Sequence, residues 1–247
     1  MLRTVGLIKT NITLGFLIVR RPGSGLACGL ENAADLIPEP PPKAVLNYQC
    51  DSWLLEFYRS MKRLFLAVPI PKKLKPALEK ELEKLKMGLS DWDVRWVAPE
   101  NLHITLVFFG WVKENQIETL KTEVGRAVSG FPSFEITTGK ISAERWPIWL
   151  EIEGGRKELQ EISEALTKNL TTKGSLEEIR DFHPHLTLGR FQNKGKSKLP
   201  KVGEIFSWKA NRIILYESAY KRRVRIYTEI ASFPLNASNT VVSSAPS

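Results

Sequence analysis

The sequence predicts an α/β protein of the α+β type, built from two lobes with mixed or antiparallel sheets. Strand and helix patterns alternate along most of the chain, and one histidine-containing strand pattern occurs twice. A regular parallel sheet is excluded, because no series of strand–helix–strand units with glycine-rich turns is present. A chain of 247 residues, 43% of them hydrophobic, can bury one large core or two smaller ones.

We expect three regions along the chain. Residues 1–60 show no sustained period and include RRPGSG and IPEPPPK, so they form an N-terminal extension that is either poorly ordered or upstream of a true start at Met61. Residues 61–235 form the folded unit. Residues 236–247 form a polar C-terminal tail with no capacity to build a core.

The folded unit begins with a strand at residues 63–68 and a turn at Pro69 and Pro71. The next helix has leucines at helical spacing and Pro76 in its first turn, and it ends near Gly88. Two later helices have apolar faces formed by Ile117, Leu120, Val124 and Val128 and by Leu159, Ile162 and Leu166. Further strands are predicted at residues 134–143, 147–153, 211–218 and 225–233.

Two apolar strands carry the same motif, His-x-Thr-Leu. Side chains alternate along a strand, so NLHITLVFFG places His103 and Thr105 on one face and HPHLTLGRF places His185 and Thr187 on one face. A single histidine on a strand is most often structural, but two copies, one in each lobe, predict a shared role. Lobes related by a pseudo-twofold axis would bring the two pairs together across a groove.

Two facing histidines suit displacement at phosphorus. Because an unperturbed histidine titrates near pH ~6.5, one imidazole can activate the entering oxygen while the other protonates the departing one. The threonine hydroxyls would donate hydrogen bonds to the non-bridging phosphate oxygens. This chemistry needs no metal, and we predict neither a metal site nor a cofactor.

The chain resembles the two-histidine (2H) phosphoesterases, and among them the bacterial and archaeal RNA 2′,3′-cyclic phosphodiesterases. The resemblance covers about residues 61–235 and rests on RLFLAVPIP, RWVAPENLHITLVFFG, FHPHLTLGRF and ILYESAYKRRVRIYTEIASFPL. Residues 1–60 match nothing in the family's pattern.

The resemblance implies hydrolysis of an RNA 2′,3′-cyclic phosphate end, of tRNA fragments among others, to a 2′-phosphomonoester. It implies His103 as the proton donor, His185 as the proton acceptor, and Thr105 and Thr187 as phosphate ligands. The residues alone leave acid and base unassigned, because the two motifs are near mirror images. A related activity in the family runs the chemistry backwards and joins tRNA halves through a 2′-5′ linkage.

Two residues near the second motif have open roles. His183 precedes His185 by two positions, but only His185 is followed by x-Thr-Leu, so we expect His183 at the rim without an essential proton. In a regular strand, Arg190 would lie on the opposite face to His185. A bulge at Gly189 would change this, so Arg190 either binds the substrate phosphate or forms a surface ion pair.

The formal net charge of +9 makes an anionic partner plausible. Basic residues downstream of the second motif form either a solvated surface or an RNA backbone contact; they are Lys194, Lys196, Lys198, Lys201 and the segment KRRVR at 221–225. Four aromatic residues could stack on a base, although core packing is the expectation for each: Trp96, Phe108, Phe109 and Tyr216.

We expect a cytoplasmic monomer without membrane contact. The only cysteines are Cys28 and Cys50, so the folded unit has neither disulfides nor a thiolate zinc site. The apolar segment LGFLIV is far shorter than the ~20 residues that a bilayer requires, and polar residues interrupt any signal peptide.

Two other functions remain open. The first is a sibling enzyme that acts on another cyclic phosphate or on a 2′-5′ oligonucleotide with the same site. The second is a non-catalytic RNA-binding module whose histidines are structural.

Overall fold

The computed structural model describes residues 60–144, 147–171, 182–200, 204–221 and 224–236. Contacts along the chain separate Met61–Ser247 from the residues before it, and only this second unit is described below. The extension at residues 1–60 and the polar tail fall almost entirely outside the described ranges, so both stay predictions.

The described chain contains nine strands, three α-helices and three short 3-10 turns. The strands are β1 (Met61–Pro69), β2 (Asp93–Trp96), β3 (His103–Lys113), β4 (Phe134–Ala143), β5 (Pro147–Gly154), β6 (His185–Asn193), β7 (Ser207–Ala210), β8 (Arg212–Lys221) and β9 (Val224–Pro234). The helices are α2 (Lys75–Gly88), α3 (Ile117–Val128) and α4 (Arg156–Thr171), and the 3-10 turns are η3 (Lys72–Leu74), η4 (Pro99–Asn101) and η5 (Glu114–Gln116).

Most predicted elements are confirmed. Helix α2 carries Pro76 in its first turn and ends at Gly88, and β4 coincides with the predicted strand. The short strands β2 and β7 escaped prediction, because each has only four residues and alternation over so few positions is not distinctive.

The strands form two sheets, one with the order β3-β1-β8-β9 and one with the order β2-β6-β5-β4-β7. All pairings between these strands are antiparallel. Each sheet contains one His-x-Thr strand, β3 in the four-stranded sheet and β6 in the five-stranded sheet. The predicted α+β class with antiparallel sheets is therefore confirmed.

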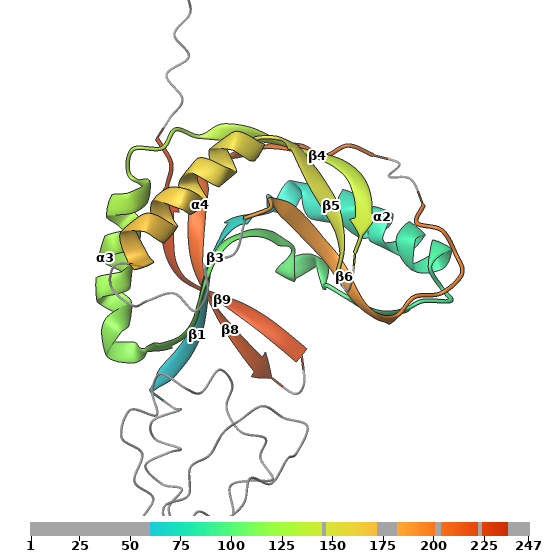
Figure 1. Cartoon of the computed structure of the whole chain (residues 1–247), viewed down its shortest axis with the longest axis horizontal. Helices are drawn as coiled ribbons and strands as arrows, with labels where there is room; N and C mark the ends of the chain where they lie inside the picture. The colour runs from blue at the N-terminus through green and yellow to red at the C-terminus, as the bar shows by residue number, and fades with distance from the viewer. Residues whose placement is uncertain (1–59, 145–146, 172–181, 201–203, 222–223, 237–247) are drawn as a thin grey trace, which may run out of the picture. The chain divides into compact units, whose positions relative to one another are not determined.

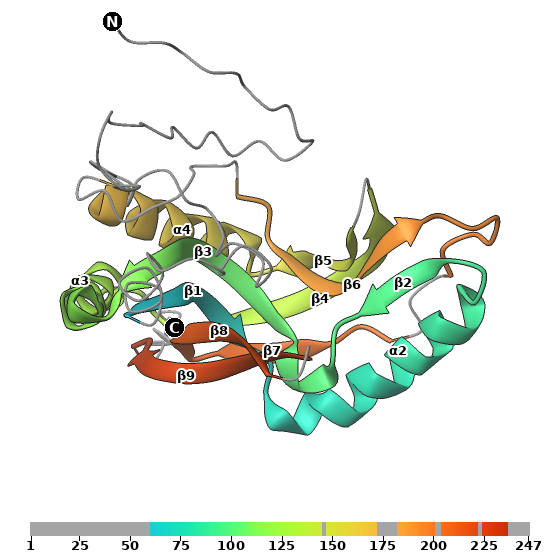
Figure 2. The ribbon, with the colours of Figure 1, turned by 90° about the horizontal axis from the view of Figure 1, so that it is seen from below.

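The helices cover the sheets and share one core with them. Helices α3 and α4 pack on each other beside the four-stranded sheet, and α2 lies beside the five-stranded sheet (Figures 1 and 2). The core joins Leu66 and Ile213 of the four-stranded sheet with Ile136 and Leu186 of the five-stranded sheet. No helix of the described chain is long and apolar enough to cross a membrane.

Candidate active site

The two His-x-Thr motifs meet where the two sheets meet. Strand β3 lies at the edge of the four-stranded sheet, next to β1, and β6 lies between β2 and β5. Strands β3 and β6 contact each other although they belong to different sheets. The tertiary structure thus brings together two motifs that are far apart in the sequence.

Strand β3 contains a bulge directly after its motif. Thr105 is paired with Ala67 and Val107 with Leu66, so Leu106 has no counterpart on β1. Leu106 and Val107 are both buried, and the next residue, Phe108, is 53% exposed. The bulge reverses the alternation and returns Phe108 to the face that holds Thr105.

Strand β6 has the same bulge at the corresponding place. Thr187 is paired with Trp149 and Gly189 with Ile148, which leaves Leu188 as the extra residue. Leu188 and Gly189 are both buried, and Arg190 is exposed. The bulge before Gly189 therefore interrupts the alternation of side chains along β6. As a result, Arg190 lies on the same face as His185 and Thr187.

Glycine at 189 is required by the neighbouring strand. A Cβ atom at this position would lie 2.9 Å from Cγ1 of Val94 and 3.0 Å from Cε3 of Trp96, both on β2. The missing side chain lets β2 approach the bulge closely.

The ring of His103 is held by neighbouring atoms of its own chain segment. Its Nδ1–H donates to the backbone carbonyl oxygen of Asn101 at 2.6 Å, and its Nε2 lies 3.0 Å from the hydroxyl oxygen of Thr105. Because a carbonyl oxygen only accepts, the neutral ring carries its proton on Nδ1. The Thr105 hydroxyl then donates to Nε2.

Aromatic rings pack around His103. The ring centre of Phe65 lies 4.9 Å from that of His103, and Tyr227 meets His103 edge-on at 5.2 Å. This burial lowers the pKa of His103 from 6.5 to about 4, against the bond to Asn101, which raises it. The charge on His185 lowers the pKa of His103 further, so the two histidines interact electrostatically.

The His185 ring is held through Nδ1, as the His103 ring is. Its Nδ1–H donates to the backbone carbonyl oxygen of His183 at 2.7 Å. The Trp149 ring lies edge-on at 6.1 Å from the His185 ring. Burial lowers the pKa of His185 against the bond to His183, and the charges on His183 and Arg190 lower it further.

In both strands, Nδ1 is fixed by the carbonyl two residues earlier, which leaves Nε2 as the nitrogen that can exchange a proton. Sequence reasoning did not find Asn101 or the carbonyl of His183, because a backbone acceptor leaves no signature in residue type. It also missed Phe65 and Tyr227, which reach His103 from other strands.

The remaining predicted residues are spread around the site. His183 has an exposed side chain and acts on His185 through its backbone and its charge.

Phe109 is buried, while Trp96 and Tyr216 are partly buried against other apolar side chains. The exposed lysines are Lys194, Lys196 and Lys198, whereas Lys201 and residues 222–223 lie outside the described ranges. Among the described residues, no three His, Cys, Asp or Glu side chains gather as a metal-binding cluster.

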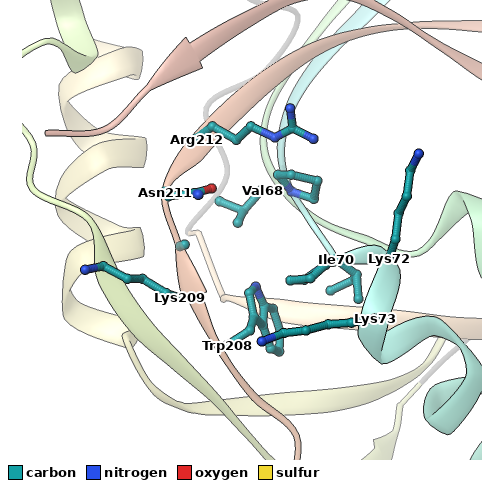
Figure 3. Close-up of a pocket in the computed structure, with 11 residues that line it drawn as sticks. Val68, Ile70, Lys72, Lys73, Trp208, Lys209, Asn211 and Arg212 are labelled. Atoms are coloured by element: carbon teal, nitrogen blue, oxygen red, sulfur yellow. The ribbon is translucent and has the colours of Figure 1, made fainter. Parts of the chain in front are cut away.

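A cavity of about 440 Å³ is lined by the end of β1, the turn η3 and the β7–β8 connection (Figure 3). Its apolar side includes Val68, Ile70 and Trp208, which belong to the core. None of the predicted site residues lines this cavity. The cavity is therefore not the site that the two motifs form.

The comparisons with known proteins agree on one family. The model of the 2′-5′ RNA ligase superfamily matches residues 74–219. The RNA 2′,3′-cyclic phosphodiesterase of Methanothermobacter thermautotrophicus is 30% identical over 185 residues, which are 70% of this chain and 98% of that protein. The RNA 2′,3′-cyclic phosphodiesterase of Thermotoga maritima is 36% identical over 135 residues, 52% of this chain and 69% of that protein.

A solved structure gives the same result. LigT of Escherichia coli in complex with 3′-AMP superimposes with a TM-score of 0.62 at 27% identity and covers 71% of this chain and 98% of its own. The resemblance drawn from the two motifs is thereby confirmed. With both motifs on contacting strands and the model matched across both, this chain belongs to the 2′-5′ RNA ligase superfamily.

Proposed function

We propose that this protein hydrolyses the 2′,3′-cyclic phosphate end of RNA to a 2′-phosphomonoester. The observation that carries the proposal is the matched histidine pair: each Nδ1–H donates to a backbone carbonyl, and the two histidines lie on strands that contact each other. The names of the relatives support the same substrate class.

The proposed reaction uses one histidine on each side of phosphorus. Nε2 of His185 takes a proton from water, whose oxygen attacks phosphorus. The bond from phosphorus to O3′ breaks, and Nε2 of His103 gives a proton to O3′. The hydroxyls of Thr105 and Thr187 donate to the non-bridging oxygens, where negative charge accumulates. The scheme uses no metal and no cofactor.

The scheme requires a protonated His103 when the substrate is bound. With a pKa of about 4, His103 is neutral in the free protein at pH 7. A negatively charged phosphate between the rings favours the charged imidazolium and raises this pKa. The substrate therefore creates the proton donor that its own cleavage needs. The choice of His103 over His185 as donor follows the family resemblance.

The residues after the two bulges complete the substrate site. Arg190 carries a positive charge on the face of His185 and binds the phosphate, and the exposed ring of Phe108 stacks on the terminal base. The partner is an RNA end, tRNA fragments included, bound by a monomer. Such a substrate is consistent with the cytoplasmic location that the sequence predicts.

The family also favours a second activity on the same site. Its model is described as the 2′-5′ RNA ligase superfamily, and joining a 2′,3′-cyclic phosphate end to a 5′-hydroxyl end is the reverse of the same chemistry. The two histidines would then exchange the roles of acid and base.

The test is incubation of the full chain with an RNA that ends in a 2′,3′-cyclic phosphate, in excess chelator, followed by identification of the product. We expect a 2′-phosphomonoester. His103→Ala and His185→Ala should each lower kcat by about 100-fold or more, with Tm retained. His183→Ala keeps the backbone carbonyl that holds the His185 ring, so its kcat should fall much less.

Other outcomes contradict the proposal in distinct ways. Full activity of either histidine variant excludes acid–base catalysis by the pair. Hydrolysis of a different cyclic phosphate or of a 2′-5′ oligonucleotide, but not of the RNA end, identifies a sibling enzyme. RNA binding without turnover identifies a binding module.

A further inference from the structure

A group of arginines extends away from the histidine pair on the same faces of the two sheets. Arg95 of β2 is paired directly with Arg190 of β6, so the two side chains share a face. Arg190 in turn lies on the face of His185. Arg95 therefore lies one strand beyond the substrate site proposed above.

The other sheet contributes Arg225 and Tyr220 from the β8–β9 hairpin, where they are paired with each other. Arg225 precedes Tyr227 by two residues without a register shift, so both lie on one face, about 6.6 Å apart along the strand. Tyr227 contacts the ring of His103. Arg225 is therefore close to the histidine pair but does not touch it.

The hydroxyl of Tyr220 joins the two sheets. It accepts a hydrogen bond from Nη2 of Arg95 at 3.4 Å and one from Nε of Arg225 at 3.2 Å. The guanidinium of Arg225 lies 4.6 Å from the centre of the Tyr220 ring, which is itself exposed. We call Arg95, Tyr220 and Arg225 the arginine–tyrosine bridge.

The bridge holds two positive charges without a carboxylate. Neither arginine forms an ion pair within the described part of the chain. A neutral hydroxyl that accepts from both cannot compensate their charges, and each guanidinium keeps further N–H donors. Two guanidinium groups with free N–H donors can form paired hydrogen bonds with the oxygens of a phosphodiester.

We infer that the arginine–tyrosine bridge binds the RNA chain upstream of the reacting end, at the phosphodiester that links the terminal nucleotide to the preceding one. The exposed ring of Tyr220 offers a stacking surface for the preceding base. The inference rests on the proposed function and adds to it: the protein distinguishes an RNA chain from a mononucleotide through residues that do not touch the reacting phosphate.

The experiment compares kcat/KM of the full chain on a short RNA with a cyclic phosphate end and on a nucleoside 2′,3′-cyclic phosphate. Arg95→Ala should lower the ratio of RNA to mononucleotide kcat/KM by about tenfold. Tyr220→Phe, which keeps the ring, should lower it less. The salt dependence of kcat/KM on the RNA should become shallower in Arg95→Ala by about one unit of slope.

Arg126→Ala is the matched control, because Arg126 is an exposed arginine on α3. An unchanged substrate ratio in Arg95→Ala, or a ratio that falls equally in Arg126→Ala, overturns the inference. If the wild type cleaves neither substrate, the proposed function fails by itself. In that case, the proposed RNA contact of the bridge is tested by measuring the affinity for the same RNA. Weaker binding by Arg95→Ala than by the wild type supports the inference, and equal affinity overturns it.

Discussion

The hydrogen bonds of His103 and His185 define how each ring can act. Each Nδ1–H is used by a backbone carbonyl, so proton exchange is confined to Nε2 in both residues. Burial lowers both pKa values, which keeps both rings neutral near pH 7 before substrate binds. Under the proposed mechanism, both rings start as bases, and the negative charge of the substrate phosphate protonates one of them so that it acts as the acid.

The lowered pKa of His103 predicts a pH-dependent stability. The unfolded chain binds a proton at His103 near pH ~6.5 and the folded chain at about 4, so this stability is complete above the unfolded pKa and falls as pH drops through this window. Between pH 7 and pH 5 the loss is about 2 kcal/mol at ~1.36 kcal/mol per pKa unit. Urea unfolding should show a loss about 2 kcal/mol larger in the wild type than in His103→Asn, because the lowered pKa of His185 contributes in both proteins. Equal pH dependence in both proteins contradicts the assignment.

At the scale of elements, helix α4 compensates the bulge in β3. The hydroxyl of Ser163, buried on α4, donates to the backbone carbonyl oxygen of Leu106 at 3.1 Å, and Leu106 is the residue without a counterpart on β1. A buried carbonyl that lacks a ladder partner costs free energy unless another donor reaches it. The helix therefore stabilises the bulge that turns Phe108 toward the site.

Ser163→Ala tests this contact. Removing the donor leaves the Leu106 carbonyl buried and unpaired, so the free energy of unfolding should fall by about 1–3 kcal/mol. Ser129→Ala is the control, because its hydroxyl donates to the carbonyl of Arg126 at an exposed helix end. Chemical denaturation should show a much smaller loss there. Equal losses in the two variants mean that the bulge does not depend on α4.

At the scale of the whole unit, the strands of the two sheets alternate along the chain, so we expect the two sheets to fold together. The four-stranded sheet combines β1 and β3 from the start of the unit with β8 and β9 from its end. Strand β2 lies between β1 and β3 in the sequence but belongs to the five-stranded sheet. Both sheets contribute to one core. The ordered contacts continue to Asn236, whose backbone bonds Phe131 and Ser133.

A fragment of residues 61–236 should therefore fold alone and unfold in a single transition. Its calorimetric and van't Hoff enthalpies should agree, because a shared core couples both sheets. A shorter fragment that ends at Ala210 loses β8 and β9 and should not fold. Two separate transitions in the longer fragment contradict a shared core.

The sequence by itself determined the local elements and the doubled motif. Alternation and helical spacing are properties of neighbouring residues, so β4, α2 and the common face of His103 and Thr105 were predictable. The short strands β2 and β7 were not, because four residues carry too little pattern.

Tertiary structure decided everything that depends on a partner strand. The face of Arg190 follows from the bulge at Leu188, which exists only in the pairing with β5. The lowered pKa of His103 follows mainly from burial among rings that other strands supply, and the arginine–tyrosine bridge joins residues of both sheets. Register and burial are set by contacts between distant segments, and the sequence pattern of one strand does not contain them.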